Sequence, residues 1–398
     1  MKIAIVSGDD IAADCGHVYD SDGHQLSAAL ASLGHDVTAY ERRGDHTRDG
    51  AAAAEYQTVS TSIGPSKRIA PRAVLPYVGE WADELVQRWS SEPPDVVHAY
   101  GWLGGLAAQL AARRPALLTV QSFYGVSASP TSVEDTERTR LQPVLARNAA
   151  WVTGGSGDDV DGLAKMRRSR AKLSILSTGV DVERFAPVGP ELPPAGLHRI
   201  LCLAPNPDPC NGFDRVIRLM PRISDAELVI AETGPTDRHF DRERGALQTL
   251  AADLAVGHRI HFAGNVTGDA LPTLVRSADV VVCPPRHSPR ATAALQAMAS
   301  AVVVVAVDTG ALTDTVIHGV TGLLVAPDQP GELVLALKTI LAERFQRQSM
   351  GASGRSRATS RFTWDRIALD ATNIYQQAIA AQSPGTTRAR GEHCATVR

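Results

Sequence analysis

The chain has 398 residues, of which 44% are hydrophobic and 21% charged, and its formal net charge is -3. This length predicts two domains of ordinary size, and the apolar share is that of a globular protein with substantial hydrophobic cores. The near-neutral charge argues against recruitment of nucleic acid or of an anionic membrane surface.

The five cysteines are scattered and form no Cys-x-x-Cys pair. Their spacing argues against a structural zinc site or a disulfide framework and predicts a cytoplasmic protein. No apolar run approaches the roughly 20 residues that cross a bilayer, so no integral membrane segment is expected. The opening MKIAIVSGDD is too short for a signal peptide and predicts a first β-strand. The sequence leaves a homo-oligomer open.

In the first half, short β-branched runs alternate with helical stretches rich in Ala and Leu. Strands buried on both faces read as continuous apolar runs, and their alternation with helices predicts a parallel, doubly wound sheet. The predicted strands are Lys2–Val6, Asp36–Tyr40, Asp95–His98, Leu117–Gln121, Trp151–Thr153 and Lys172–Leu176, and the predicted helices are His24–Leu33 and Leu103–Ala112.

Residues 177–198, rich in Pro and Gly, predict a linker to a second alternating series. Two such halves create a cleft, and ligands of these sheets sit at the C-terminal ends of the strands. The predicted strands are Ile200–Leu203, Glu227–Ala231, Arg259–Phe262, Val280–Cys283 and Val302–Val307; the predicted helices are Phe213–Met220, Gly245–Ala255, Leu271–Arg276, Ala291–Ser300 and Glu332–Ala342, followed by helical sequence through Phe362 and a last helix from Trp364 to about residue 381.

Seven segments, in order, resemble the family 4 retaining glycosyltransferases of the GT-B architecture, nearest to the sucrose-phosphate-synthase-like actinobacterial members. They are LGHDVTAYERR (33–43), PDVVHAYGWLGGLAA (94–108), STGVDVERFAP (177–187), NGFDRVIRLMPRISDAELVIAETGP (211–235), LQTLAADLAVGHRIHFAGNV (247–266), GALTDTVIHGVTGLLVAPDQP (310–330) and FTWDRIA (362–368).

The resemblance implies an α/β protein of GT-B fold, with two Rossmann-like domains facing a cleft. Residues 1–176 would form the acceptor domain, 177–198 the linker, 199–362 the nucleotide-sugar donor domain and 363–381 a helix crossing back to the first domain. The tail, 382–398, is expected to be disordered because it is polar and bears Pro and Gly. The implied activity is metal-independent transfer of a hexose, with retention, from a nucleotide-diphosphate sugar to an unknown small-molecule or glycan acceptor. No separate cofactor is implied.

The donor-domain chemistry departs from the family pattern. Ser288 and Gln296 stand where the family has two glutamates, and Asn206 and Asn211 stand where it has the Arg and Lys of the diphosphate site. Realignment does not restore them, because no Lys occurs from 173 to 337 and no Glu from 244 to 331. The amide side chains can donate hydrogen bonds but carry no charge.

Other site positions follow from the same resemblance. Tyr124 takes the place of a sugar-facing His, and Gly212 and Asn265 fall in the nucleotide-sugar site. Asp22-Gly23 is the best candidate for the Gly-Gly loop after the first strand, with Gly23 as the site residue, and Gly16 is the other option.

One feature could compensate for the lost cations. Arg290 precedes the helix predicted from Ala291, whose N-terminus faces the diphosphate in this fold, so that Arg290, Ala291 and Thr292 would cradle phosphate. The alternative is that Arg290 is a solvated loop charge in an Arg-rich protein.

Two functions therefore remain open: a nucleotide-sugar-dependent transferase with altered contacts, or a catalytically silent pseudo-transferase that binds a ligand or a partner. Sugar-nucleotide epimerisation is disfavoured, because it needs placed carboxylates. The Asp-x-Asp of residues 159–161 suggests a metal in another fold, but acidic residues that open a helix are explained by its dipole.

Overall fold

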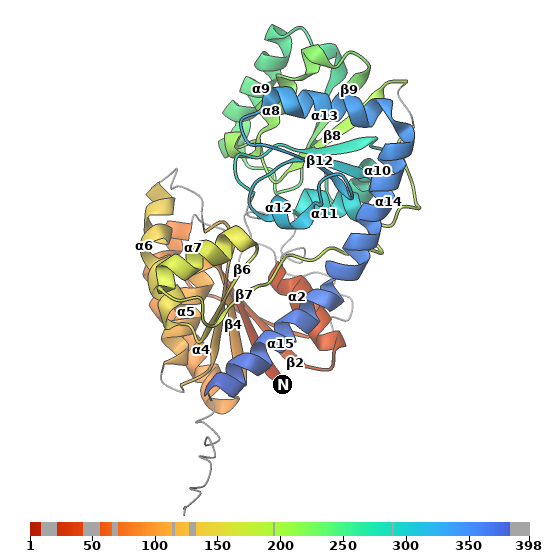
Figure 1. Cartoon of the computed structure of the whole chain (residues 1–398). Helices are drawn as coiled ribbons and strands as arrows, with labels where there is room; N and C mark the ends of the chain where they lie inside the picture. Colours follow the sequence, from red (N-terminus) through yellow and green to blue (C-terminus); the bar gives the residue numbers. More distant parts are fainter. Residues whose placement is uncertain are drawn as a thin grey trace, which may run out of the picture.

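The computed structural model describes residues 1–8, 22–42, 56–65, 71–113, 116–126, 133–193, 196–288 and 290–382. These residues form two Rossmann-like domains, each built on a parallel sheet covered by helices on both faces (Figure 1). The first sheet has the order β3-β2-β1-β4-β5-β6-β7. Its strands are β1 (Lys2–Ser7), β2 (Asp36–Arg42), β3 (Gln57–Thr61), β4 (Val96–Tyr100), β5 (Thr119–Phe123), β6 (Trp151–Gly154) and β7 (Leu173–Ile175).

The second sheet has six strands in the order β10-β9-β8-β11-β12-β13. Both orders reverse direction beside the first strand of their sheet, which is the point where doubly wound folds bind ligands. The strands are β8 (His198–Ala204), β9 (Ala226–Glu232), β10 (Ile260–Asn265), β11 (Val280–Cys283), β12 (Val303–Val307) and β13 (Gly322–Val325).

The central strands are buried along their whole length because helices cover both faces of each sheet. Every residue of β4, β5, β9, β11 and β12 is buried. Each fully buried Val, Leu or Ile side chain contributes about 1.5–3 kcal/mol, so these strands contribute substantially to the driving force for folding.

The helices divide between the sheet faces. In the first domain, α2 (Asp22–Ser32) and α15 (Trp364–Gln382) pack on one face; α4 (Val78–Ser91), α5 (Gly101–Ala112), α6 (Val133–Asn148) and α7 (Gly157–Arg167) cover the other. In the second domain, α8 (Phe213–Ile217), α9 (Asp241–Asp253) and α13 (Pro330–Ala342) share one core; α10 (Ala270–Arg276), α11 (Thr292–Ala299), α12 (Ala311–Thr315) and the end of α14 (Arg344–Arg361) share the other.

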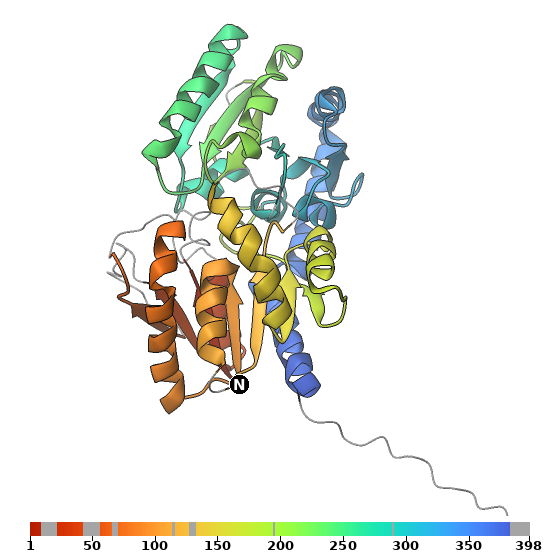
Figure 2. The same ribbon diagram turned by 90° about the vertical axis from the view of Figure 1, so that its left-hand side faces the viewer.

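The last helix crosses from the second domain to the first, as the family resemblance implies. In Figures 1 and 2, α14 and α15 run as a continuous blue arm from one domain along the other. The turn between them is fixed to the chain after β7, because the Val180 N–H donates to the carbonyl of Phe362 at 2.7 Å. Gly179 packs against the ring of Trp364 at the same place.

The predicted elements are confirmed, with boundary differences at several ends and several omissions. Helix α8 ends at Ile217 and continues as a 3-10 turn over Met220–Arg222, whereas α9 begins at Asp241, ahead of the predicted Gly245. Strands β3 and β13, which lie at sheet edges, were not predicted: β3 reads QTVST and lacks an apolar run, and β13 has only four residues. Helices α4, α6 and α12 were also missed; α6 contains Pro143, a residue that argues against helix.

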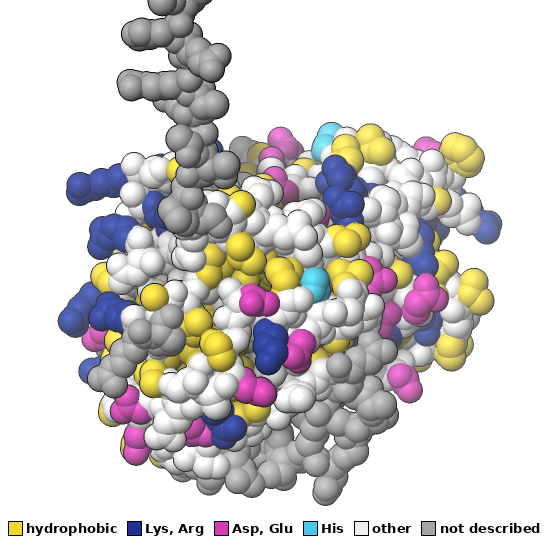
Figure 3. Space-filling model, turned by 90° about the horizontal axis from the view of Figure 1, so that it is seen from below, with side chains coloured by type: hydrophobic (Ala, Val, Ile, Leu, Met, Phe, Trp, Pro, Cys, Tyr) yellow, Lys and Arg dark blue, Asp and Glu magenta, His cyan; other side chains and the backbone are white. Residues whose placement is uncertain are grey.

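Within the described ranges, no helix combines the length and apolar character needed to cross a membrane. The face of the molecule in Figure 3 carries basic and acidic side chains together, with apolar side chains between them. This mixture agrees with the near-neutral net charge.

Candidate functional site

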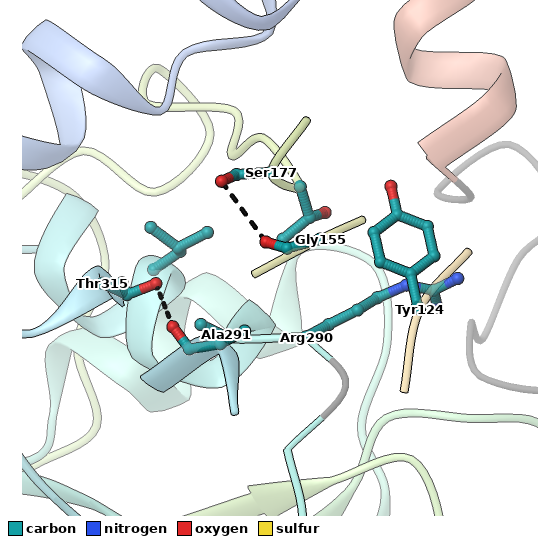
Figure 4. A pocket seen from close by; sticks show the side chains of 9 residues that line it. Tyr124, Gly155, Ser177, Arg290, Ala291 and Thr315 are labelled. Atoms are coloured by element: carbon teal, nitrogen blue, oxygen red, sulfur yellow. Dashed lines mark hydrogen bonds between the residues drawn. The ribbon is translucent and has the colours of Figure 1, made fainter. Parts of the chain in front are cut away.

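A small pocket lies where the C-terminal strand ends of the two sheets face each other. Its first-domain wall consists of Tyr124, Gly155, Ser177 and Thr178, and its second-domain wall of Arg290, Ala291, Leu295, Ala311 and Thr315 (Figure 4). The enclosed space is about 10 Å³, which holds roughly one water molecule. A nucleotide sugar requires several hundred Å³, so the two walls are closed upon each other in this structure.

Arg290 spans the pocket from the second domain to the first. Its guanidinium carbon lies 4.5 Å from the centroid of the Tyr124 ring, an arrangement visible in Figure 4. Its Nε lies 3.5 Å from Oδ2 of Asp22, and the two side chains are only 9% and 7% exposed. The alternative that Arg290 is a solvated loop charge is therefore wrong, because the side chain is buried between the domains.

Asp22 is the buried carboxylate that faces Arg290. It opens helix α2, whose N-terminal dipole favours a negative charge. Its Oδ1 accepts a hydrogen bond of 2.8 Å from the hydroxyl of Thr178. The sequence placed Gly23, the next residue, in a Gly-Gly loop; instead Gly23 lies inside the first turn of α2, where a Cβ would meet the Ser7 hydroxyl. The alternative, Gly16, lies outside the described residues.

Tyr124 rests on a column of buried rings. Its ring stacks on Tyr100 with centroids 6.4 Å apart, and Tyr100 stacks on His98 at 4.6 Å. Burial, and then the nearby Asp22 and Tyr100, raise the pKa of Tyr124 well above its usual value, so the phenol stays neutral at physiological pH.

His98 joins this column to the crossover helix. Its Nδ1 lies 2.6 Å from the Tyr375 hydroxyl on α15, and its Nε2 lies 2.7 Å from the Ser122 hydroxyl on β5. Burial lowers the pKa of His98 to about 3, so the imidazole is neutral. The position of Tyr124 is thus tied to the seating of α15 on the sheet.

The loop that carries Gly155 is fixed by Asp159. This buried carboxylate accepts the N–H groups of Val126 at 2.7 Å and of Gly155 at 3.2 Å, and Ser156 caps the helix by accepting from Asp159 N–H. Burial raises the pKa of Asp159, while these hydrogen bonds oppose the shift. The carboxylate is therefore structural, and the described residues hold no cluster of three or more metal-ligating side chains.

Backbone contacts build the second-domain wall. A Cβ on Gly310 would overlap the carbonyl oxygen of Ser288, which also accepts the Ala311 N–H at 2.9 Å. A Cβ on Gly212 would overlap the carbonyl oxygen of Pro284 in the same way. Two glycines with positive φ thus let neighbouring loops touch the loop that carries Arg290.

Ser288 and the two asparagines hold loops in this structure. Ser288 lies in the loop before α11 rather than at the start of the helix, and its hydroxyl donates to the carbonyl of Arg290 at 2.7 Å. The Asn211 amide donates to the side-chain and backbone oxygens of Asn206, at 2.9 and 3.0 Å. Asn265 is exposed at the end of β10, and its amide donates to the Gly234 carbonyl.

The remaining predicted residues lie on α11. The helix begins at Thr292, which is exposed, and Ala291 is its N-cap residue, buried in the pocket. Gln296 is half-buried one turn further on, beside the pocket residue Leu295.

A second contact joins the two domains beside the pocket. The backbone N–H of Gly157, in the first turn of α7, donates to Oδ2 of Asp314 on α12 at 2.7 Å. Nearby, burial and then Arg138 lower the pKa of His287, which lies on a loop of the second domain, so this imidazole is neutral. The interface therefore pairs a carboxylate with a helix N-terminus on one side of the pocket and Asp22 with Arg290 on the other.

The sequence analysis placed Asp22 only in the candidate Gly-Gly loop with Gly23, without a role for its carboxylate, and it missed Thr178. Asp22 directly precedes Gly23, so its place beside the first strand was available from the sequence. Its partner Thr178 is 156 residues away, and no local pattern connects the two. Only the meeting of α2 with the segment after β7 makes them neighbours.

Comparison with known proteins agrees with this geometry. Residues 199–357 match the model of the glycosyl transferases group 1, and residues 24–184 match that of glycosyltransferase family 4. An uncharacterised glycosyltransferase of Methanocaldococcus jannaschii is 33% identical over 171 residues, which are 42% of each chain. A D-inositol 3-phosphate glycosyltransferase of Salinispora tropica is 26% identical, over 72% of this chain and 64% of that protein. The matches thus span less than two thirds of either relative.

Two solved structures share the fold. Sucrose-phosphate synthase from Thermosynechococcus elongatus superposes with a TM-score of 0.83 at 24% identity, over 96% of this chain and 99% of the other. Anabaena HepE in complex with UDP and glucose superposes with a TM-score of 0.74 at 15% identity, over 94% and 99%. The two family models match successive parts of the chain, and the structure has both domains and the crossover helix. This chain therefore belongs to the family 4-type glycosyltransferases of the GT-B fold.

Proposed function

We propose that the protein transfers a hexose from a nucleotide-diphosphate sugar, with retention and without a metal ion, and that Arg290 provides the main cationic contact to the diphosphate. Arg290 carries this proposal, since it is the cationic side chain that reaches into the pocket at the N-terminus of α11. HepE, whose fold is shared, has been solved with UDP and glucose.

Charge development explains why this residue matters. As the bond to the sugar breaks, negative charge grows on the nucleoside diphosphate. Backbone N–H groups at a helix N-terminus and a planar guanidinium both stabilise such a charge. Ala291 and Thr292 offer the N-terminal N–H groups of α11, and Arg290 precedes them. With this arrangement the charge is stabilised by the protein alone.

Other residues are assigned by their position around this centre. Gln296, half-buried on α11, would accept or donate a hydrogen bond to the ribose. Tyr124, neutral and on the opposite wall, would lie against the transferred sugar or the acceptor. Asn206, Gly212, Asn265 and Ser288 would shape the loops on which the diphosphate and base rest.

Calorimetric titration with UDP-, GDP- and ADP-sugars, followed by a donor-hydrolysis assay, tests the proposal. One of these nucleotide sugars is expected to bind, and Arg290→Ala should lower the affinity for it about a hundredfold. The reason is that loss of one charge-assisted hydrogen bond to a buried anion costs about 3 kcal/mol. Arg286→Ala is the matched control: this Arg lies in the same loop but is 59% exposed and pairs with Asp214, so its loss should change affinity less than threefold.

The alternative is a pseudo-transferase that retains the fold for binding alone. Donor binding without hydrolysis or transfer, over a panel of sugar and polyol acceptors, would favour it. Absence of binding by any nucleotide sugar would reject the proposed function outright.

A further inference from the structure

Asp22 and Arg290 form a buried ion pair between the domains at the place where the donor diphosphate is proposed to bind. The pair is made by side chains that are 7% and 9% exposed, with Nε and Oδ2 3.5 Å apart. A carboxylate at an anion site is unfavourable for the anion, so its presence needs a reason. Resting on the proposed function, we infer that Asp22 is a positioning residue that holds the Arg290 guanidinium in the cleft until a diphosphate displaces it.

Asp22 is itself held in place for this role. Thr178 donates to its Oδ1 at 2.8 Å, and the first turn of α2 stabilises its charge. The Tyr124 ring supports the guanidinium from the side, 4.5 Å away. Among the described residues, the first domain thus places the carboxylate of Asp22 and the ring face of Tyr124 against the Arg290 guanidinium.

Competition between two anions follows from this geometry. The pocket beside Arg290 holds about 10 Å³, which is too small for a diphosphate, so a diphosphate that reaches Arg290 has to displace contacts that Arg290 makes, including the one with Asp22. A guanidinium that is already paired with a carboxylate gives up part of its attraction for phosphate. Removing the charge of Asp22 should consequently strengthen diphosphate binding, although it also removes one stabilising contact of Arg290 in the free protein.

Titration calorimetry with UDP-glucose and with inorganic pyrophosphate tests this inference. Asp22→Asn should bind both about tenfold more tightly, while Asp22→Glu, which keeps the charge, should stay within about threefold of wild type. Asp314→Asn is the matched control, because Asp314 also bridges the domains, at Gly157, but does not touch Arg290. Its affinity should stay near the wild-type value.

A double-mutant cycle separates competition for Arg290 from other causes. In the Arg290→Ala background, the gain from Asp22→Asn should fall below about twofold. Unchanged or weaker binding by Asp22→Asn overturns the inference. So does an equal gain in Asp314→Asn, which would indicate general loosening of the interface, or a gain that persists without Arg290.

The same double-mutant cycle can be measured by thermal unfolding of the Asp22→Asn, Arg290→Ala and double variants, without any ligand. Each single variant should lower the melting temperature, and the double variant should lower it by clearly less than the sum; additive shifts would overturn the inference. If wild type binds no nucleotide sugar but the stability cycle shows coupling, the proposed function fails while the buried pair stands. The two failures are therefore distinguishable.

Discussion

The two walls of the pocket are built by different means. The second-domain wall depends on backbone approach: Gly310 lets one loop touch the carbonyl of Ser288, and Gly212 lets another touch Pro284. The first-domain wall depends on side chains held by buried polar contacts, with Tyr124 on the Tyr100 and His98 column and Asp22 bonded to Thr178.

This difference indicates which parts of a binding site can be recognised from the amino-acid sequence. A wall made by backbone needs glycine at set places, so its pattern survives even when the functional side chains change. A wall made by side chains uses residues from distant segments, and it can be rebuilt with other residue types. Asn206, Asn211, Ser288 and Gln296, which depart from the family pattern, lie in the second domain, where Gly212 and Gly310 allow close contact between the loops.

The backbone-built wall should be the more easily broken. Gly310→Ala is expected to lower the free energy of unfolding by about 3 kcal/mol, because the new Cβ would overlap the Ser288 carbonyl at a positive φ. Chemical denaturation measures this loss. Gly319→Ala is the matched control: its φ is also positive, at 75°, but nothing lies within 4 Å, so only about 1 kcal/mol of backbone strain is expected. Equal losses would show that the close approach is unimportant.

The buried histidine behind the first-domain wall should make the stability of the protein depend on pH. The pKa of His98 is lowered to about 3 by burial, whereas the unfolded chain takes up this proton below about 6.5. The unfolded state therefore binds more protons as pH falls, and stability is lost at about 1.4 kcal/mol per pH unit below 6.5. Between pH 7 and 5 this amounts to about 2 kcal/mol.

His98→Gln tests that dependence, because Gln can bond Tyr375 and Ser122 without titrating. Denaturation curves at pH 7 and 5 should differ by about 2 kcal/mol less in the variant than in wild type. His318→Gln, an exposed histidine bonded to the Leu324 backbone, is the control and should leave the difference unchanged. A variant with the full wild-type pH dependence would contradict the neutral, buried role of His98.

Asn211→Ala should have the smallest effect on stability and affinity. It tests whether a loop residue of the second-domain wall also contacts the ligand. The Asn211 amide donates its hydrogen bonds to Asn206 in this structure. Its loss should therefore lower the free energy of unfolding by about 1 kcal/mol. Affinity for UDP-glucose should change by less than threefold. A fall of a hundredfold would instead show that Asn211 turns to the diphosphate and replaces the lost lysine.

Much of the fold was predictable, because buried parallel strands carry their own signal. The run Val280–Cys283 is apolar throughout and is a strand as predicted. Edge strand β3, with the sequence QTVST, has two exposed positions among its five and was missed for that reason. Helix α6 was missed because Pro143 contradicts a helical pattern that tertiary packing tolerates.

The candidate site divides in the same way. Arg290, Tyr124 and Ala291 were identified from their positions in the chain, and the structure brings all three into one pocket. The carboxylate of Asp22 was given no role and Thr178 was not identified, and Ser288 and Asn211 proved to bond within their own loops. Local sequence indicates where a strand ends and a loop begins, but not which loop of the other domain will meet it.

The sequence by itself determined the two-domain α/β fold, the crossover helix, the family and the loop that carries Arg290, because hydrophobic periodicity and glycine placement act over short stretches of chain. Only the tertiary structure decided what Arg290 does in the closed protein. A carboxylate at residue 22 and a guanidinium at residue 290 are paired by domain closure, and the energy of a buried charge depends on its neighbours in space.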